Sequence, residues 1–100
     1  MRALSLNCHG LRNPQTVNEL HDVVKKEGLN LVFLMETRLT KSSLEWLRVR
    51  LRMRGCLGVD RHESGGRGGL VLLWDSTVDV TVRGYSVHHI DVEVNQSDGL

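Results

Sequence analysis

The sequence has a single proline, no low-complexity tract and no repeat, so it shows no sign of an internal linker or domain boundary. We therefore expect one small domain, or part of a larger one, over residues 1–100. No stretch reaches the ~18 apolar residues that a membrane span requires, and the N-terminus lacks an apolar segment of signal-peptide length. These absences predict an intracellular protein, nuclear or cytoplasmic, with no membrane partner.

An excess of charge of one sign is also missing. The sequence has 13 Lys and Arg against 12 Asp and Glu, a formal net charge of +1. No global basic field therefore indicates nucleic acid, and any polyanion must be bound locally. The two cysteines, Cys8 and Cys56, form no CxxC pair and lie in apolar surroundings. They predict reduced, buried thiols, with a disulfide between them as the less favoured alternative.

The first part of the chain predicts a strand followed by a helix. Residues 3–6 form a short apolar run that is typical of a buried strand, and polar residues follow it. Asn13 before Pro14 suits a helix start, and apolar residues beyond them recur at helical spacing. Gly28 supplies a stop, so we predict a helix over residues 14–27.

A second strand and a second helix are predicted next. Residues 29–35 are apolar almost without interruption, which favours a strand covered on both faces. From Ser42 a capping pattern opens a helix whose apolar face carries Leu44, Leu47 and Leu51.

From Cys56 onward the sequence predicts β-structure. Short β-prone segments, separated by turn signals, cover residues 57–60, 69–74, 78–82 and 88–94. In the last two segments apolar and polar residues alternate, as expected for half-buried antiparallel strands. The predicted order is β-α-β-α-β-β-β-β, an α/β (α+β) arrangement with a mixed sheet.

Two side chains at the predicted strand ends have metal-binding chemistry. Asn7 follows the first strand, and Glu36 ends the second. If the helix between them is a crossover that joins neighbouring parallel strands, both side chains emerge at the same sheet edge. Carboxylate and amide oxygens suit a hard cation such as Mg²⁺. On spacing alone, simple caps or surface groups remain the favoured interpretation of both residues.

Three blocks of the sequence, in order, resemble the endonuclease/exonuclease/phosphatase superfamily. They read LSLNCHGL from Leu4 to Leu11, LVFLMET from Leu31 to Thr37 and GGLVLLW from Gly68 to Trp74. The sequence is most similar to the apurinic-type endonuclease domain of LINE-type non-LTR retrotransposons, in which an Asn-x-x-Gly-Leu turn and a Leu-x-Glu-Thr strand end recur. The resemblance implies that residues 1–100 are the N-terminal part of an incomplete four-layer α/β-sandwich of the DNase I-like type.

The resemblance also implies a Mg²⁺-dependent DNA endonuclease that hydrolyses phosphodiester bonds with metal-activated water, with Mn²⁺ as an alternative cofactor. The family residue matching Glu36 binds the catalytic metal, and the one matching Asn7 helps to hold the metal and the scissile phosphate. His9 stands where the apurinic branch often has Asp, so phosphate contact is its candidate role and a solvated side chain the favoured alternative. Arg67 is a candidate contact to the DNA phosphate backbone, although a hairpin-like connection is the favoured interpretation of its glycine-rich segment, residues 65–69.

Other parts of the family's site have no counterpart in this sequence. The general-base His of a Ser-Asp-His block and the Asp-x-Asn motif come from later strands, so we expect this chain alone to be inactive. We expect its exposed sheet faces to be covered by a missing C-terminal half or by another chain. The alternative is a non-catalytic small α/β binding module or a retroelement remnant.

Several conspicuous residues are assigned ordinary structural roles. His89 and Asp91 are expected on the solvent face of a strand and not in a catalytic pair. Trp46 and Trp74 are expected to pack and not to stack on bases. Four arginines near the second helix are expected to form a solvated face, with phosphate contact by one or two as the alternative: Arg48, Arg50, Arg52 and Arg54.

Overall fold

A computed structural model describes residues 1–8, 11, 14–39, 41–59, 69–86 and 89–96. Its elements are β1 (Ala3–Asn7), α1 (Pro14–Glu27), β2 (Leu31–Met35), α2 (Lys41–Arg50), β3 (Gly55–Val59), β4 (Leu70–Trp74), β5 (Val78–Tyr85) and β6 (Ile90–Gln96). The predicted order β-α-β-α-β-β-β-β and the predicted α/β class are therefore confirmed. The first helix has the predicted bounds.

The strands form two sheets. In the larger sheet the order is β1-β2-β4-β3, with β1 parallel to β2 and with β4 antiparallel to both of its neighbours. β5 and β6 form an antiparallel ribbon, with a register irregularity between Val82 and Gly84. The predicted mixed sheet is thus confirmed. Its parallel pair is the one that α1 connects, since parallel neighbours need a crossover.

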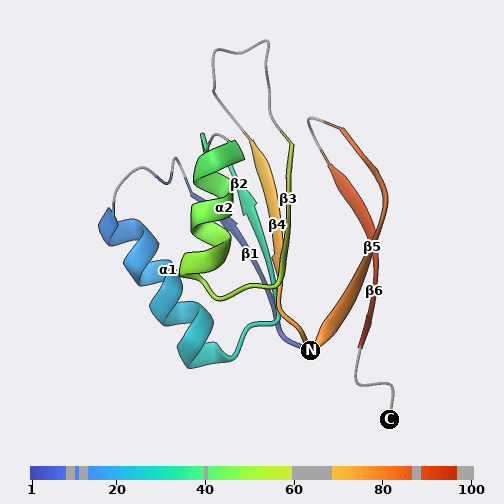
Figure 1. The fold of residues 1–100 in the computed structure, drawn as a ribbon, viewed down its shortest axis with the longest axis horizontal. Coiled ribbons are helices and arrows are strands. Elements are labelled where there is room, and N and C mark those ends of the chain that lie inside the picture. The colour runs from blue at the N-terminus through green and yellow to red at the C-terminus, as the bar shows by residue number, and fades with distance from the viewer. Residues whose placement is uncertain (9–10, 12–13, 40, 60–68, 87–88, 97–100) are drawn as a thin grey trace.

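The elements stack in layers (Figure 1). Both helices lie on one face of the four-stranded sheet, and the β5-β6 ribbon lies on the other side. In β4, which lies between β2 and β3, Leu70 through Leu73 are all buried. Because neighbouring side chains of a strand point to opposite faces, both faces of β4 are covered. This arrangement is consistent with part of the layered sandwich that the resemblance implies.

α1 packs on the sheet through one apolar stripe. Val17, Leu20 and Val24 are buried, at a spacing that places their side chains on one face of a helix. They share a hydrophobic core with Val32 and Leu34 of β2. Burying one such side chain contributes roughly 1.5–3 kcal/mol, so this contact with the sheet is the main source of stability for the helix.

Gly28 ends α1, as the sequence predicts. Its φ is 59, in the left-handed region that glycine adopts without steric cost. The Gly28 N–H donates to the Lys25 carbonyl at 3.4 Å, and the Leu29 N–H donates to the Val24 carbonyl at 3.0 Å. These two bonds form a Schellman motif, which satisfies carbonyls left open at the helix end. β2 therefore begins at Leu31, and the predicted start of this strand at residue 29 is wrong.

The prediction that the first strand is buried is also wrong. In β1 Leu4 is half-buried and every other residue is exposed, including Leu6 at 40%. β1 is an edge strand: across the described ranges, β2 is its one sheet neighbour. An edge strand lies at the rim of the layers, so its side chains keep access to water.

Burial in β2 alternates, whereas the sequence predicts coverage of both faces. Val32 and Leu34 are fully buried on the helix side, while Leu31, Phe33 and Met35 are half-buried. β2 lies between β4, which is covered on both faces, and the exposed edge strand β1. Coverage of the ribbon side therefore declines from β4 through β2 to β1.

α2 packs on the sheet through the predicted leucines. Leu47 and Leu51 are buried and Leu44 is half-buried. Gly58 of β3 makes room for this helix, because a Cβ atom at that position would lie 2.6 Å from the Leu44 side chain. The two helices among the described residues are both too short or too polar to cross a membrane.

The two tryptophans differ in their environments. Trp46 of α2 is 52% exposed, so the prediction that it packs in the interior is wrong. Trp74 is half-buried, and its indole covers Gly55, where a Cβ atom would lie 2.2 Å from the ring. The predicted packing role of Trp74 is therefore confirmed. The amphipathic spacing of the second helix did not reveal that the sheet leaves Trp46 uncovered.

Candidate functional site

Asn7 and Glu36 lie at the same edge of the four-stranded sheet. Asn7 is the register partner of Met35 across the β1-β2 pair, and Glu36 directly follows Met35. The predicted parallel pairing of these strands is confirmed, and Figure 1 shows both strands running in the same direction. Both side chains are exposed. Neighbouring strand ends thus present an amide and a carboxylate, whose roles as metal ligands stay a prediction.

Glu36 belongs to a turn with strained backbone. Glu36 and Arg38 have φ values of 54 and 55, in the left-handed region that costs a non-glycine residue roughly 1–3 kcal/mol. Between them, the side chain of Thr37 is almost fully buried, with the residue only 1% exposed. Such strain persists only where the surrounding structure holds the backbone in place. The turn therefore presents the Glu36 carboxylate from a firmly held position.

Backbone hydrogen bonds hold this turn against two other segments. The Thr37 N–H donates to the Gly69 carbonyl at 3.3 Å, and the Thr37 carbonyl accepts from the Leu11 N–H at 3.0 Å. The Cys8 N–H donates to the Met35 carbonyl at 2.9 Å, which extends the pairing of β1 and β2 by one bond. The ends of β1 and β2 and the start of β4 therefore meet at this edge.

Gly69 allows the close approach of this turn to β4. Its φ is +104, and a Cβ atom there would lie 3.1 Å from Thr37 Oγ1 and 3.6 Å from the Arg38 backbone nitrogen. A side chain would therefore strain the backbone and press on buried Thr37. Gly69 is the last residue of the glycine-rich segment, and the strands on either side of that segment, β3 and β4, are antiparallel neighbours. The rest of the segment, for which the sequence predicts a hairpin-like connection, lies outside the described residues.

The other predicted substrate contacts, His9 and Arg67, lie outside the described residues. Sequence reasoning did not single out Thr37 or Arg38, although both belong to the turn that carries Glu36. Thr37 closes the LVFLMET block, but nothing in that block indicates that the residue is buried, and Arg38 lies beyond the block. Arg38 is exposed, which places a cation two residues from the Glu36 carboxylate.

The side-chain oxygens at this edge suit a hard cation but form only part of a ligand set. Mg²⁺ prefers oxygen ligands, which the carboxylate of Glu36 and the amide of Asn7 both provide. Among the described residues, no group of three or more His, Cys, Asp or Glu side chains is placed to hold a metal ion. The two residues therefore fit Mg²⁺ as members of a ligand set and not as a complete one.

Both cysteines have free thiols, in agreement with the prediction that favoured reduced cysteines over a disulfide. They are half-buried, so the prediction of full burial is wrong. Burial raises the pKa of the Cys8 thiol from 9.0 to about 11. Burial, together with the nearby Glu45 carboxylate, also raises the pKa of Cys56. Cys8 adjoins Asn7 but stays a neutral thiol at physiological pH, which makes it a poor metal ligand.

His89 and Asp91 are both exposed, as the sequence predicts. Asp91 lies in β6, whereas His89 precedes the strand, so the predicted strand position of His89 is wrong. His89 Nδ1 is 2.7 Å from Ser86 Oγ, and the Ser86 N–H donates to the His89 carbonyl at 2.8 Å. These local hydrogen bonds give His89 a structural role at the junction of β5 and β6.

The four arginines have different roles. Arg48 is half-buried and donates to the Met53 carbonyl at 3.1 Å, so the prediction of a solvated side chain is wrong for this residue. This bond links α2 to the segment that follows it, because Met53 lies beyond the end of the helix. Arg50 donates to Asn18 Oδ1 at 2.6 Å and thereby links α2 to α1. The remaining two are exposed and follow the end of the helix: Arg52 and Arg54.

Comparison with known protein families identifies a match. The family model described as Endonuclease/Exonuclease/phosphatase family matches residues 4–96. The match extends from β1 into β6 and includes both Asn7 and Glu36. No curated protein matches the chain.

Proposed function

The chain belongs to the endonuclease/exonuclease/phosphatase family, and we propose on this basis that it forms the N-terminal part of a divalent-metal-dependent phosphodiesterase domain. We further propose that its substrate is the phosphodiester backbone of DNA, because its sequence blocks resemble those of LINE-type endonucleases. One observation carries the proposal: the parallel register of β1 and β2 sets Asn7 beside the residue that precedes Glu36.

In this proposal Glu36 supplies the carboxylate that binds Mg²⁺, or Mn²⁺ in its place. Asn7 would help to hold the site from the neighbouring strand, because an amide oxygen can bind a cation and amide N–H groups can donate to a phosphate oxygen. The left-handed backbone around buried Thr37 keeps the position of Glu36 constant while substrate binds. When bound, the metal lowers the pKa of a water molecule and offsets negative charge on the phosphoryl oxygens.

We also propose that this chain binds metal and phosphate but does not cleave DNA by itself. Hydrolysis requires a general base, which the family takes from a Ser-Asp-His block, and a further phosphate anchor, which it takes from an Asp-x-Asn block. Neither block occurs in the 100-residue sequence. A further polypeptide segment, or another chain, would have to supply them.

A Mn²⁺ titration of the full chain tests the metal site. Mn²⁺ is paramagnetic and broadens the NMR signals of nearby nuclei, so we expect selective broadening of the amides of Cys8, Glu36 and Thr37. Excess Mg²⁺ should reverse it. Glu36→Gln keeps the size of the side chain but removes its charge, and should abolish the broadening. Glu19→Gln, in α1, is the matched control. Broadening that survives Glu36→Gln would overturn the ligand assignment.

Plasmid nicking tests the expected lack of activity. The purified chain should leave supercoiled plasmid intact in the presence of Mg²⁺. Nicking that disappears in Glu36→Gln would overturn the proposal of inactivity while supporting the metal site. Nicking that is equal in Glu36→Gln would indicate a contaminating nuclease.

A non-catalytic binding module is the second candidate function. The observation that favours it is the incomplete cover of β2 on the ribbon side of the sheet, where Phe33 and Met35 are only half-buried. Apolar surface of this kind is typical of a protein interface. The metal titration separates the two candidates, because a binding module has no reason to bind Mn²⁺ through Glu36.

A further inference from the structure

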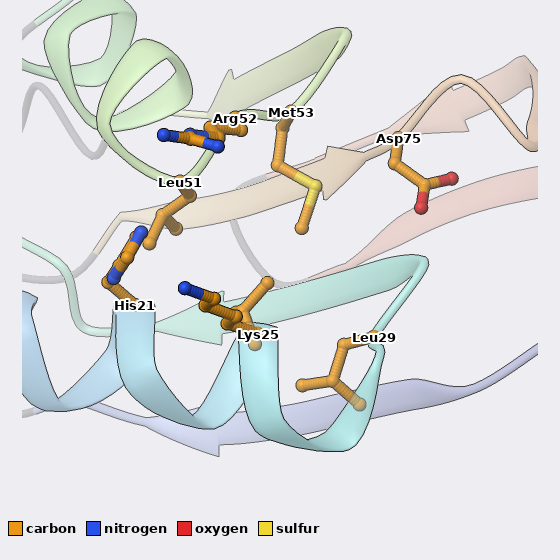
Figure 2. Close-up of a pocket in the computed structure, with 8 residues that line it drawn as sticks. His21, Lys25, Leu29, Leu51, Arg52, Met53 and Asp75 are labelled. Carbon is orange, nitrogen blue, oxygen red and sulfur yellow. The ribbon is translucent and has the colours of Figure 1, made fainter.

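A pocket lies at the end of the sheet opposite to Asn7 and Glu36, and Figure 2 shows side chains that line it. Asp75, one of its lining residues, follows β4, and its N–H donates to the carbonyl of Asn30, just before β2 begins. Glu36 follows the other end of β2, so the length of this strand separates the pocket from the candidate metal edge. The pocket has a volume of about 220 Å³. No sequence motif pointed to it.

The floor of the pocket is apolar. It consists of four side chains, all buried, from the C-terminal half of α1, the chain entering β2 and the segment after α2: Val24, Leu29, Leu51 and Met53. Met53 is unbranched and polarisable, which allows it to adapt to the shape of a ligand. An inorganic ion would gain nothing from such a floor, whereas a ligand with an apolar body would bury that body against it.

Nitrogen-bearing side chains line one end of the pocket. His21 and Lys25 are one turn apart on α1, and Arg52 follows α2. Figure 2 shows the nitrogen atoms of all three at the same end of the view, away from Asp75. Ion pairs elsewhere occupy Arg2, Arg48 and Arg83, and His21 Nδ1 lies 3.6 Å from Asp22 Oδ1. Within the described part of the chain, neither Lys25 nor Arg52 has an acidic partner. Both cations are therefore available to an incoming anion.

The one carboxylate of the pocket is already engaged. Asp75 Oδ2 accepts from Asn30 Nδ2 at 2.9 Å, and Asp75 Oδ1 accepts from the Thr77 N–H at 2.9 Å and from Thr77 Oγ1 at 2.6 Å. Burial opposes ionisation of Asp75, but these hydrogen bonds outweigh it and lower the pKa of the carboxyl group. Its charge is thus stabilised by its neighbours and lies at the far end of the pocket from the cations.

We propose that this pocket binds a compact organic anion, with one carboxylate or phosphate group on a single apolar ring. The anionic group would meet Lys25 and Arg52, with His21 beside them, and the ring would cover Leu51 and Met53. The volume of about 220 Å³ suits a ligand of this size, because pockets for drug-sized molecules occupy roughly 300–1,000 Å³. This pocket is separate from the proposed metal edge, so an experiment can disprove either proposal without affecting the other.

An NMR titration of the full chain with phenyl phosphate and with benzoate tests the proposal. We expect saturable shifts of the Leu29, Leu51 and Met53 amides, with a Kd on the order of 1 mM, as is usual for a ligand of this size. Benzyl alcohol has the ring without the charge, and inorganic phosphate has the charge without the ring. Both should bind at least about tenfold more weakly, because each lacks half of the recognition.

Paired variants identify the cations. Lys25→Gln and Arg52→Asn should each weaken binding of phenyl phosphate about 3- to 10-fold, as expected for one charged contact. Asn is chosen at position 52 because the φ of Arg52 is 57 and Asn tolerates this left-handed conformation. Lys26→Gln and Arg54→Asn remove the same charges from neighbouring positions that do not line the pocket. These controls should change the Kd less than about twofold.

Several outcomes would overturn the proposal. Equal losses in the controls and in the pocket variants would mean that the anion senses only the overall charge. If benzyl alcohol bound with equal affinity, the negative charge would not contribute to binding. If inorganic phosphate bound with equal affinity, the apolar floor would not contribute. Shifts confined to Cys8 and Glu36 would place the ligand at the other end of the sheet.

Discussion

Gly69 is a residue at which the candidate metal edge tolerates little change. In Gly69→Ala the new methyl group would lie 3.1 Å from Thr37 Oγ1, at a φ of +104 that L-residues rarely adopt. We expect the free energy of unfolding to fall by roughly 1–3 kcal/mol, measured by urea denaturation. Gly84→Ala is the matched control, because no atom lies within 4 Å of a Cβ placed there. Equal losses in both variants would contradict the close approach.

The thiol of Cys8 provides a pH-dependent test at the same edge. Burial raises its pKa to about 11, so iodoacetamide should alkylate it slowly at neutral pH and about tenfold faster per pH unit up to that value. The rate is measured in Cys56→Ala, which leaves one thiol. A plateau already near pH 9.0, the ordinary thiol pKa, would contradict the effect of burial.

The same pKa shift predicts how the stability of the folded chain changes with pH. The thiol of the unfolded chain loses its proton near pH 9.0, whereas the folded chain keeps its proton until about pH 11. The stability that this neutral thiol contributes is therefore present below pH 9.0 and is lost as the pH rises between the two values.

Sequence reasoning found only part of the candidate site at the residue scale. Asn7 and Glu36 could be proposed because each occupies a strand end within a block that resembles a family motif. The burial of Thr37 could not be foreseen, because Gly69, which packs closely against this residue, lies far away in the sequence. The strain at Arg38 could not be foreseen for the same reason, since it is maintained by tertiary contacts.

At the scale of elements, α1 is held by its buried stripe. Leu20 is 4% exposed and Val23 of the same helix is 41% exposed. Leu20→Ala should lower the free energy of unfolding by about 2–5 kcal/mol, because it removes buried methyl groups and leaves a cavity. Val23→Ala should change it by less than about 1 kcal/mol, because the side chain is already hydrated. Guanidinium denaturation measures both, and similar losses would contradict the assigned orientation of the helix.

The elements differ in how well the sequence predicted them. The bounds of α1 were predicted because Pro14 and Gly28 act on adjacent backbone alone. Burial of β1 was predicted wrongly, because an apolar run does not reveal whether a strand lies in the centre of a sheet or at its edge. The exposure of Trp46 was missed for a similar reason: it depends on the angle at which α2 meets the sheet.

At the scale of the whole molecule, the proposed metal site lies on the less covered side. Coverage of the ribbon side of the sheet declines from β4 through β2 to β1. Asn7 is the last residue of β1, and Glu36 directly follows β2. The net charge of only +1 means that attraction of a polyanion must come from such local groups and from the bound metal. The proposed ligands come together only when β1 and β2 pair in the folded chain. Metal binding should therefore stabilise the folded chain as a whole.

Addition of Mg²⁺ tests this coupling. At about ten times its Kd, an ion that binds only the folded chain stabilises it by about 1.4 kcal/mol. For a domain of this size the Tm should rise by roughly 5–10 °C, measured by differential scanning calorimetry. EDTA should reverse the rise, and Glu36→Gln should abolish it. A rise of the same size in Glu36→Gln would show that the ion stabilises the chain from another position.

The sequence by itself determined the order of the elements, the α/β class and the bounds of α1, because caps, glycine stops and apolar periodicity act over a few residues. Only the tertiary structure decided the sheet order, the exposure of β1, the burial of Thr37 and the pocket between α1 and the segment after α2. These features arise from contacts between distant residues. Local sequence patterns predicted one such meeting, that of the two parallel strands joined by α1, and did not indicate the others.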